Sequence, residues 1–163
     1  MVFAGKVLAD AVRLIKGDRY RSRLISKIMF GTYNKHIKNV RTVNDWLTRD
    51  EAVVDEYNAG KLTTFLFTVN GYRGLMNMIL YVRKPRNIER IPKNLPMLMI
   101  SGLDDPVGEY GKGVYRAYDS YHGHIDDIDL RLYENCRHEL CNELNKEEIY
   151  EEIYGWIMAH MSK

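Results

Sequence analysis

Two short stretches of the chain carry side chains that could do acid–base chemistry. In "YENCRHELC", His138 stands between Cys136 and Cys141. In "SGLDDPVG", Asp104 and Asp105 follow each other. An acid that orients an imidazole, while the imidazole takes a proton from a hydroxyl, forms the base half of a Ser-His-Asp triad. The two stretches therefore make one candidate site if the fold brings them together.

The cysteines offer two other interpretations of His138. The first is a zinc site, but structural zinc needs four ligands, usually with cysteines two to four residues apart. The spacing here is Cys-x4-Cys with no second ligand pair, so we expect no metal and no other cofactor. The second is a cysteine nucleophile, which needs a correctly placed base that adjacency in sequence does not supply. We expect both cysteines to be reduced thiols.

Two predicted strands near the C-terminus would position these side chains. "LPMLMISG" is a short apolar run that ends at Gly102, and "IDLRLYE" alternates apolar and polar residues. A helix over residues 112–121 separates them, and another helix follows from about residue 145, so the pattern indicates parallel strands of an α/β fold. Functional residues of such sheets lie just past the carboxyl ends of the strands. We therefore expect the aspartates and His138 at one edge of the sheet.

The chain before Asn94 is predicted to be helical. An apolar stripe over residues 7–15 predicts a helix that Gly17 ends, and a second short helix follows. Thr48 and Glu51 have the spacing of a capping box at the start of a third helix. The most apolar stretch, residues 64–82, contains two glycines and is interpreted as two helical pieces.

Several motifs together resemble a known family. "LPMLMISGLDDPVG" followed by "YENCRHEL" closely resembles the C-terminal part of α/β-hydrolases of the monoacylglycerol lipase, lysophospholipase and serine aminopeptidase S33 group. "FGTYNKHI", "DWLTRDEAVVDEY", "FTVNGYRGL" and "NIERIPKNLP" are similar to the helical cap of bacterial members. The resemblance implies a helical lead-in over 1–30, a cap or lid over 31–94 and a C-terminal portion of the core over 95–163.

The resemblance also implies roles for individual residues. The family's triad acid falls on Asp105, three positions after Gly102, and His138 falls on the general base. Asp104 is then a loop or capping residue. Without the resemblance, Asp105 would be read as a turn or capping acid, an interpretation that Pro106 supports.

The nucleophile of the family has no counterpart in this sequence. Such hydrolases carry the serine in Gly-x-Ser-x-Gly on a strand-to-helix turn. None of the five serines lies in that motif: Ser22, Ser26, Ser101, Ser120 and Ser162. Two parallel strands also make no stable sheet alone. We expect an incomplete α/β-hydrolase fold, with an N-terminal half missing or supplied by a separate chain, and no activity of this chain by itself.

The expected function is hydrolysis of carboxylic esters in lipid-like substrates, with an apolar acyl pocket. Its predicted lining is Phe67, Leu75, Met76 and Ile79. The alternative is a non-catalytic remnant or interaction module that binds a partner, or its own copy, through the sheet edge.

Charge and composition limit the remaining classes. Residues 1–41 carry ten Lys or Arg against two Asp, so a basic amphipathic start could contact membrane lipid, although solvated helix faces explain it as well. No nucleic-acid motif is present. No apolar run approaches the ~20 residues of a membrane span, and no export signal is evident, so we expect a cytoplasmic protein.

Overall fold

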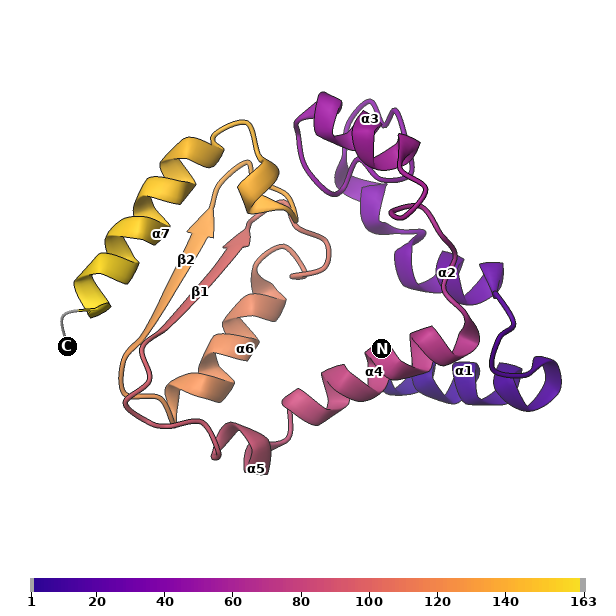
Figure 1. Cartoon of the computed structure of the whole chain (residues 1–163), viewed down its shortest axis with the longest axis horizontal. Coiled ribbons are helices and arrows are strands. Elements are labelled where there is room, and N and C mark those ends of the chain that lie inside the picture. The colour runs from indigo at the N-terminus through magenta and orange to yellow at the C-terminus, as the bar shows by residue number, and fades with distance from the viewer. Residues whose placement is uncertain (1, 162–163) are drawn as a thin grey trace.

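The computed structural model describes residues 2–161. It consists of a small parallel sheet flanked by helices and an arm of helices beside it (Figure 1). The N-terminal part contains α1 (Val2–Lys16), α2 (Arg23–Phe30), η1 (Tyr33–His36), α3 (Glu51–Ala59), α4 (Val69–Val82) and α5 (Pro85–Ile88). The C-terminal part contains β1 (Met97–Gly102), α6 (Lys112–His122), β2 (Ile128–Tyr133), η2 (Leu140–Asn142) and α7 (Lys146–Met161).

The predicted strand–helix–strand–helix unit is confirmed. β1 and β2 pair in parallel, from Met97 opposite Ile128 to Gly102 opposite Tyr133, and α6 is the crossover between them. Figure 1 shows α6 and α7 on opposite sides of the strands. Because both strands end at the same edge, the loops that follow them start next to each other.

Alternating residues of the strands contact α7 on one face of the sheet. The Tyr133 hydroxyl donates to Glu152 Oε2 at 2.9 Å, and Trp156 Nε1 donates to Asp129 Oδ2 at 2.7 Å. Cys136, Leu140 and Ile149 form a buried cluster at the N-terminal end of α7. This cluster fixes the loop after β2 against the last helix.

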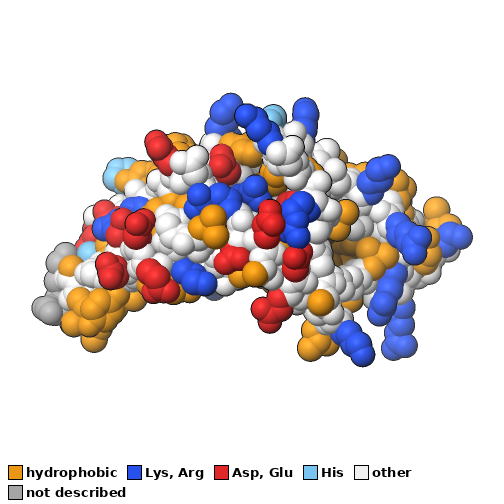
Figure 2. Space-filling model, turned by 90° about the horizontal axis from the view of Figure 1, so that it is seen from above, with side chains coloured by type: hydrophobic (Ala, Val, Ile, Leu, Met, Phe, Trp, Pro, Cys, Tyr) orange, Lys and Arg blue, Asp and Glu red, His pale blue; other side chains and the backbone are white. Residues whose placement is uncertain are grey.

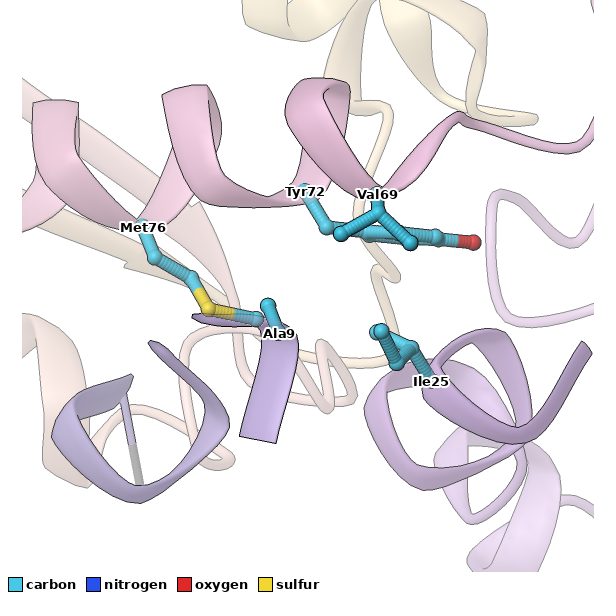
Figure 3. Packing of buried hydrophobic residues seen from close by; sticks show 5 residues of the cluster. All are labelled: Ala9, Ile25, Val69, Tyr72 and Met76. Atoms are coloured by element: carbon cyan, nitrogen blue, oxygen red, sulfur yellow. The ribbon is translucent and has the colours of Figure 1, made fainter. Parts of the chain in front are cut away.

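A second apolar cluster joins α1, α2 and α4. Its buried members come from all three helices (Figure 3): Ala9, Ile25, Val69, Tyr72 and Met76. The small Ala9 side chain is fully buried, which allows α1 to approach α4 closely. Each large aliphatic side chain removed from such a cluster costs about 2–5 kcal/mol.

Two helix boundaries differ from the predictions. The stretch 64–82 contains one helix rather than two pieces, since residues 64–68 are not helical and α4 begins after Thr68, whose hydroxyl accepts from Gly71 N, and continues through Gly74. An internal glycine costs a helix only about 1 kcal/mol, which the buried Tyr72 and Met76 offset. At α3 the cap is Asp50, not Thr48, because the Asp50 carboxylate accepts from Ala52 N and Val53 N.

Much apolar surface of the helices stays exposed. On α1, Phe3, Val7 and Leu14 lie on the face opposite Ala9 and are exposed, and so are Tyr154 and Met158 on α7. Figure 2 shows Lys and Arg side chains gathered at the end of the molecule that holds the N-terminal helices. Within residues 2–161, no helix is both long enough and apolar enough to cross a membrane.

Candidate active site

The loops after β1 and β2 are joined at the carboxyl edge of the sheet. Leu103 N donates to Tyr133 O and Asp104 N donates to Cys136 O, each at 2.9 Å. The two loops approach so closely at Gly102 that a Cβ there would lie 2.0 Å from the Cys136 carbonyl oxygen. A glycine at this position therefore lets the loop after β2 cross directly over the end of β1.

This crossing brings Asp105 and His138 together, as the family resemblance implied. His138 Nδ1 lies 3.1 Å from Asp105 Oδ2. Because a carboxylate accepts, Nδ1 is the donor, which leaves Nε2 as the ring nitrogen for a second partner. Asp104 is exposed, whereas Asp105 is only 5% exposed. Of the two neighbouring aspartates, Asp105 is thus the one that contacts the imidazole.

Asp105 also has the local role that the alternative interpretation gave it. Its Oδ1 accepts from Val107 N at 2.8 Å, which closes a turn over Pro106. One carboxylate oxygen therefore holds the loop and the other holds the histidine. The turn fixes the direction in which Oδ2 points, so the two roles support each other.

The pKa of His138 is raised above its ordinary value of 6.5. The main cause is the hydrogen bond to Asp105, which opposes the effect of burial, and the negative charges of Asp105 and Glu139 act in the same direction as the bond. The pair therefore stabilises the imidazolium, as a base that must accept a proton requires. The side chain remains 37% exposed.

Aromatic residues that sequence reasoning did not single out surround the histidine. The Trp46 ring lies 5.1 Å from the His138 ring, and Tyr33 packs edge-on against Trp46 at 4.9 Å. Burial raises the pKa of Tyr33, and the charge of Asp105 adds to this effect. The segments "FGTYNKHI" and "DWLTRDEAVVDEY" were marked only by resemblance, and their aromatic rings contact the site.

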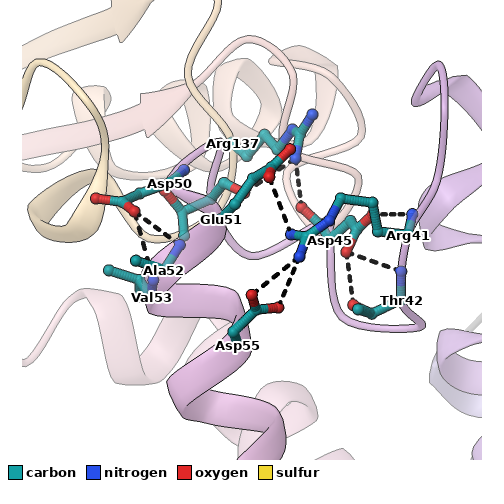
Figure 4. A network of polar contacts seen from close by, with 10 residues as sticks. Arg41, Thr42, Asp45, Asp50, Glu51, Ala52, Val53, Asp55 and Arg137 are labelled. Atoms are coloured by element: carbon teal, nitrogen blue, oxygen red, sulfur yellow. Dashed lines mark hydrogen bonds and ion pairs between the residues drawn. The ribbon is translucent and has the colours of Figure 1, made fainter.

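A network around Glu143 joins the loop after β2 to residues 45–49. We call Thr48, Arg49, Arg137 and Glu143 the Glu143 network. The Glu143 side chain is fully buried, and its Oε2 pairs with Arg49 Nε at 2.8 Å. Arg137 Nη1 donates to the carbonyl oxygens of Asp45 and Thr48 at 2.7 and 2.9 Å. Figure 4 shows Arg137 beside Asp45. Sequence reasoning missed this network.

The predicted acyl-pocket residues lie on or just before α4. Phe67 is 39% exposed, Leu75 is 36% exposed and Ile79 is half-buried. Met76 is 2% exposed and belongs to the cluster between α1 and α4. The lining of an acyl pocket by these four side chains stays a prediction.

The cysteines and serines are placed as follows. Cys136 is buried, Cys141 is exposed and both are free thiols. In the described part of the chain, no group of three or more His, Cys, Asp or Glu side chains is arranged to hold a metal ion. Ser22 caps α2, Ser101 donates to Gly102 O and Ser120 donates to Arg116 O, while Ser162 lies outside the described residues.

Comparisons with known proteins agree on one family. The family described as "Serine aminopeptidase, S33" matches residues 4–145. An uncharacterised abhydrolase domain-containing protein of Dictyostelium discoideum is 31% identical over 112 residues, which are 68% of this chain and 11% of that protein.

Solved structures show the same fold. A thermostable carboxyl esterase of Bacillus coagulans in complex with glycerol has a TM-score of 0.84 at 20% identity, over 99% of this chain and 52% of its own. A lipase in an open form has a TM-score of 0.78 at 22% identity, over 91% and 48%. A monoglyceride lipase of Saccharomyces cerevisiae has 0.57 at 17%, over 92% and 49%. The chain thus spans about half the length of these proteins.

Proposed function

The chain belongs to the serine aminopeptidase S33 family of α/β-hydrolases, and from this premise we propose that it is the C-terminal portion of a serine hydrolase that cleaves carboxylic esters. The observation that carries the proposal is the 3.1 Å contact between His138 Nδ1 and Asp105 Oδ2 at the carboxyl edge of the sheet. The incomplete α/β-hydrolase fold, with two parallel strands in the described residues, supports the same assignment.

In the proposed mechanism His138 acts first as a base and then as an acid. Its Nε2 takes the proton of a serine hydroxyl while the serine oxygen attacks the ester carbonyl, and the imidazolium then protonates the leaving alcohol. Asp105 keeps the proton on Nδ1 and stabilises the imidazolium. The serine and the groups that stabilise the oxyanion come from polypeptide outside these 163 residues, either an N-terminal half or a separate chain.

We propose a lipid-like substrate, such as a lysophospholipid or a monoacylglycerol. The support is apolar surface on the helical arm, including the half-exposed Phe67 and Leu75. In this account residues 31–94 act as the cap, and the exposed apolar face of α1 touches the rest of the hydrolase or a lipid surface. Two of the related structures, a carboxyl esterase and a monoglyceride lipase, agree with an ester substrate.

The test is hydrolysis of p-nitrophenyl esters of increasing chain length. We expect no turnover by the chain alone, and turnover when a complementary segment with Gly-x-Ser-x-Gly is co-expressed. In the active complex, His138→Ala should lower kcat by about 10⁶-fold. Glu148→Gln, an exposed acid on α7, is the matched control and should have no effect. Turnover by the chain alone that His138→Ala abolishes would show that the nucleophile is within it.

A second candidate is an interaction module without catalysis. The observation that favours it is the two-stranded sheet, whose outer edges carry no further strand within residues 2–161. Such edges pair readily with another chain. Sedimentation of the purified chain distinguishes the candidates: a stable homodimer that gains no esterase activity with any complementary segment would favour the module.

A further inference from the structure

We propose that the Glu143 network positions His138: it binds the loop over residues 136–145 to the segment 45–49 and so holds the imidazole against Asp105. The inference deepens the proposed function and rests on it, since His138 needs a fixed orientation if it acts as the base. Glu143, Arg49 and Thr48 are then positioning residues rather than catalytic residues.

The network fixes both neighbours of His138 in the sequence. His138 itself lies between β2 and η2, in neither helix nor strand. On one side, the Arg137 guanidinium donates to the carbonyl oxygens of Asp45 and Thr48. On the other side, Glu139 N donates to Leu47 O at 2.7 Å. The backbone of His138 is therefore held from both sides by a segment about 90 residues earlier in the chain.

Glu143 is the fixed point of these contacts. Its Oε1 accepts from Arg137 N at 2.7 Å and from Arg49 N at 3.3 Å, while Oε2 accepts from Arg49 Nε and Leu144 N. A buried carboxylate is tolerated only when its oxygens are paired in this way. Because displacement of the segment 45–49 would take the Arg49 guanidinium and backbone N–H away from this buried charge, the network favours one arrangement of the two segments.

Thr48 and Asn145 extend the same junction without added charge. The Thr48 hydroxyl donates to Asn142 O at 2.8 Å, and Arg49 Nη2 donates to Asn145 Oδ1 at 2.8 Å. Thr48 is 1% exposed, so the bond is shielded from water. Substitution of Thr48 therefore offers a way to loosen the junction while every ionised group stays in place.

The segment 45–49 also contacts the imidazole itself. Trp46 stacks at a tilt against the His138 ring, and Trp46 is carried between Asp45 and Leu47, which the loop after β2 contacts. The charged groups that act on the imidazole are Asp105, from the loop after β1, and Glu139, from its own loop. In the described structure Glu143 makes no hydrogen bond to either ring nitrogen. Its influence on His138 is therefore through the position of the loop that carries the ring.

The experiment is an NMR titration of the His138 ring in the purified chain, which needs no ester turnover. Glu143→Gln and Thr48→Val should each lower the pKa of His138 toward the ordinary value of about 6.5, and weaken the downfield signal of the Nδ1 proton. Glu148→Gln removes an exposed charge and is the control, with no expected change.

The inference is overturned if both variants keep the fold, judged from the backbone spectrum, and the pKa of His138 is unchanged. Should Glu143→Gln fail to fold, Thr48→Val decides, because it alters no charge and removes only the two hydrogen bonds of the Thr48 hydroxyl, one to Asn142 O and one from Asp50 N. Loss of this inference would leave the ester-hydrolysis proposal intact. Conversely, the pKa of His138 could fall in both variants while the complex with a complementary segment hydrolyses no ester. That result would contradict the proposed function alone.

Discussion

Different kinds of interaction stabilise the carboxyl edge of the sheet and the helical arm. At the edge, polar groups from residues 45–49 and 136–145 meet around the buried Glu143, and each of its carboxylate oxygens accepts hydrogen bonds. In the arm, α1, α2 and α4 share one apolar cluster and leave other apolar side chains exposed. Directional bonds fix positions, whereas apolar packing fixes proximity. Only directional bonds can orient a histidine whose Nε2 must accept a proton from one direction.

The largest expected losses in the free energy of unfolding come from removing the central side chain of each region. Glu143→Ala leaves Arg49 partly buried without its carboxylate and should cost about 3–5 kcal/mol in the free energy of unfolding. Met76→Ala in the apolar cluster should cost about 2–5 kcal/mol. Urea unfolding of both single variants and the double variant gives the values.

The two losses should add, since the hydrogen-bond partners of Glu143 and the residues of the Met76 cluster are different side chains. A coupling well above about 0.5 kcal/mol would mean that the two side chains interact energetically through the packing between the edge and the arm. Such a coupling would contradict separate stabilisation of the two regions, because the polar junction would then depend on the apolar cluster.

Substitution of glycine by alanine should have opposite effects on stability in the two regions. Gly102→Ala should destabilise the chain by about 3 kcal/mol, because the new Cβ would meet the Cys136 and Arg137 carbonyl oxygens at 2.0 and 2.3 Å. Gly74→Ala on α4 meets nothing within 4 Å and should stabilise by up to about 1 kcal/mol. Thermal unfolding by circular dichroism measures both. Equal effects would show that the loops at the edge can separate freely.

The smallest expected effect is the pH dependence that His138 contributes. Its pKa in the folded chain is raised above 6.5 by Asp105, so its stabilising contribution is complete below pH 6.5 and is lost as the pH rises through the folded pKa. Urea unfolding at a series of pH values should show this decline in the wild type and not in His138→Gln. A decline of equal size in the variant would assign it to other groups.

The parallel unit, and with it an aspartate close to His138, could be predicted because short-range patterns encode the strands, whereas the choice of Asp105 over Asp104 was implied by the family resemblance. An apolar run closed by Gly102 and an alternating run over residues 128–133 predict the strands, and parallel strands place the following loops at one edge. The same kind of pattern was misleading for residues 64–82, where two glycines indicated a break. The buried Tyr72 and Met76 outweigh their cost, so α4 is continuous.

The Glu143 network could not be predicted because its partners are far apart in the sequence. Glu143 and Arg49 are separated by 94 positions, and Glu143 stands in an acidic stretch where most side chains face solvent. Nothing in "CNELNKEE" distinguishes Glu143 from its neighbours until the loop after β2 is placed on residues 45–49. Trp46 was missed for the same reason, since its contact with His138 depends on this placement.

If Asp105 and His138 form the base half of a triad, the pKa of His138 must depend on the Asp105 carboxylate. We predict a value above 6.5 in the wild-type chain, since Asp105 raises it, and a clear fall in Asp105→Asn, with Asp104→Asn unchanged. An NMR titration of the His138 ring measures all three. If Asp105→Asn left the pKa of His138 unchanged, or Asp104→Asn lowered it instead, the assignment of the pair would be wrong.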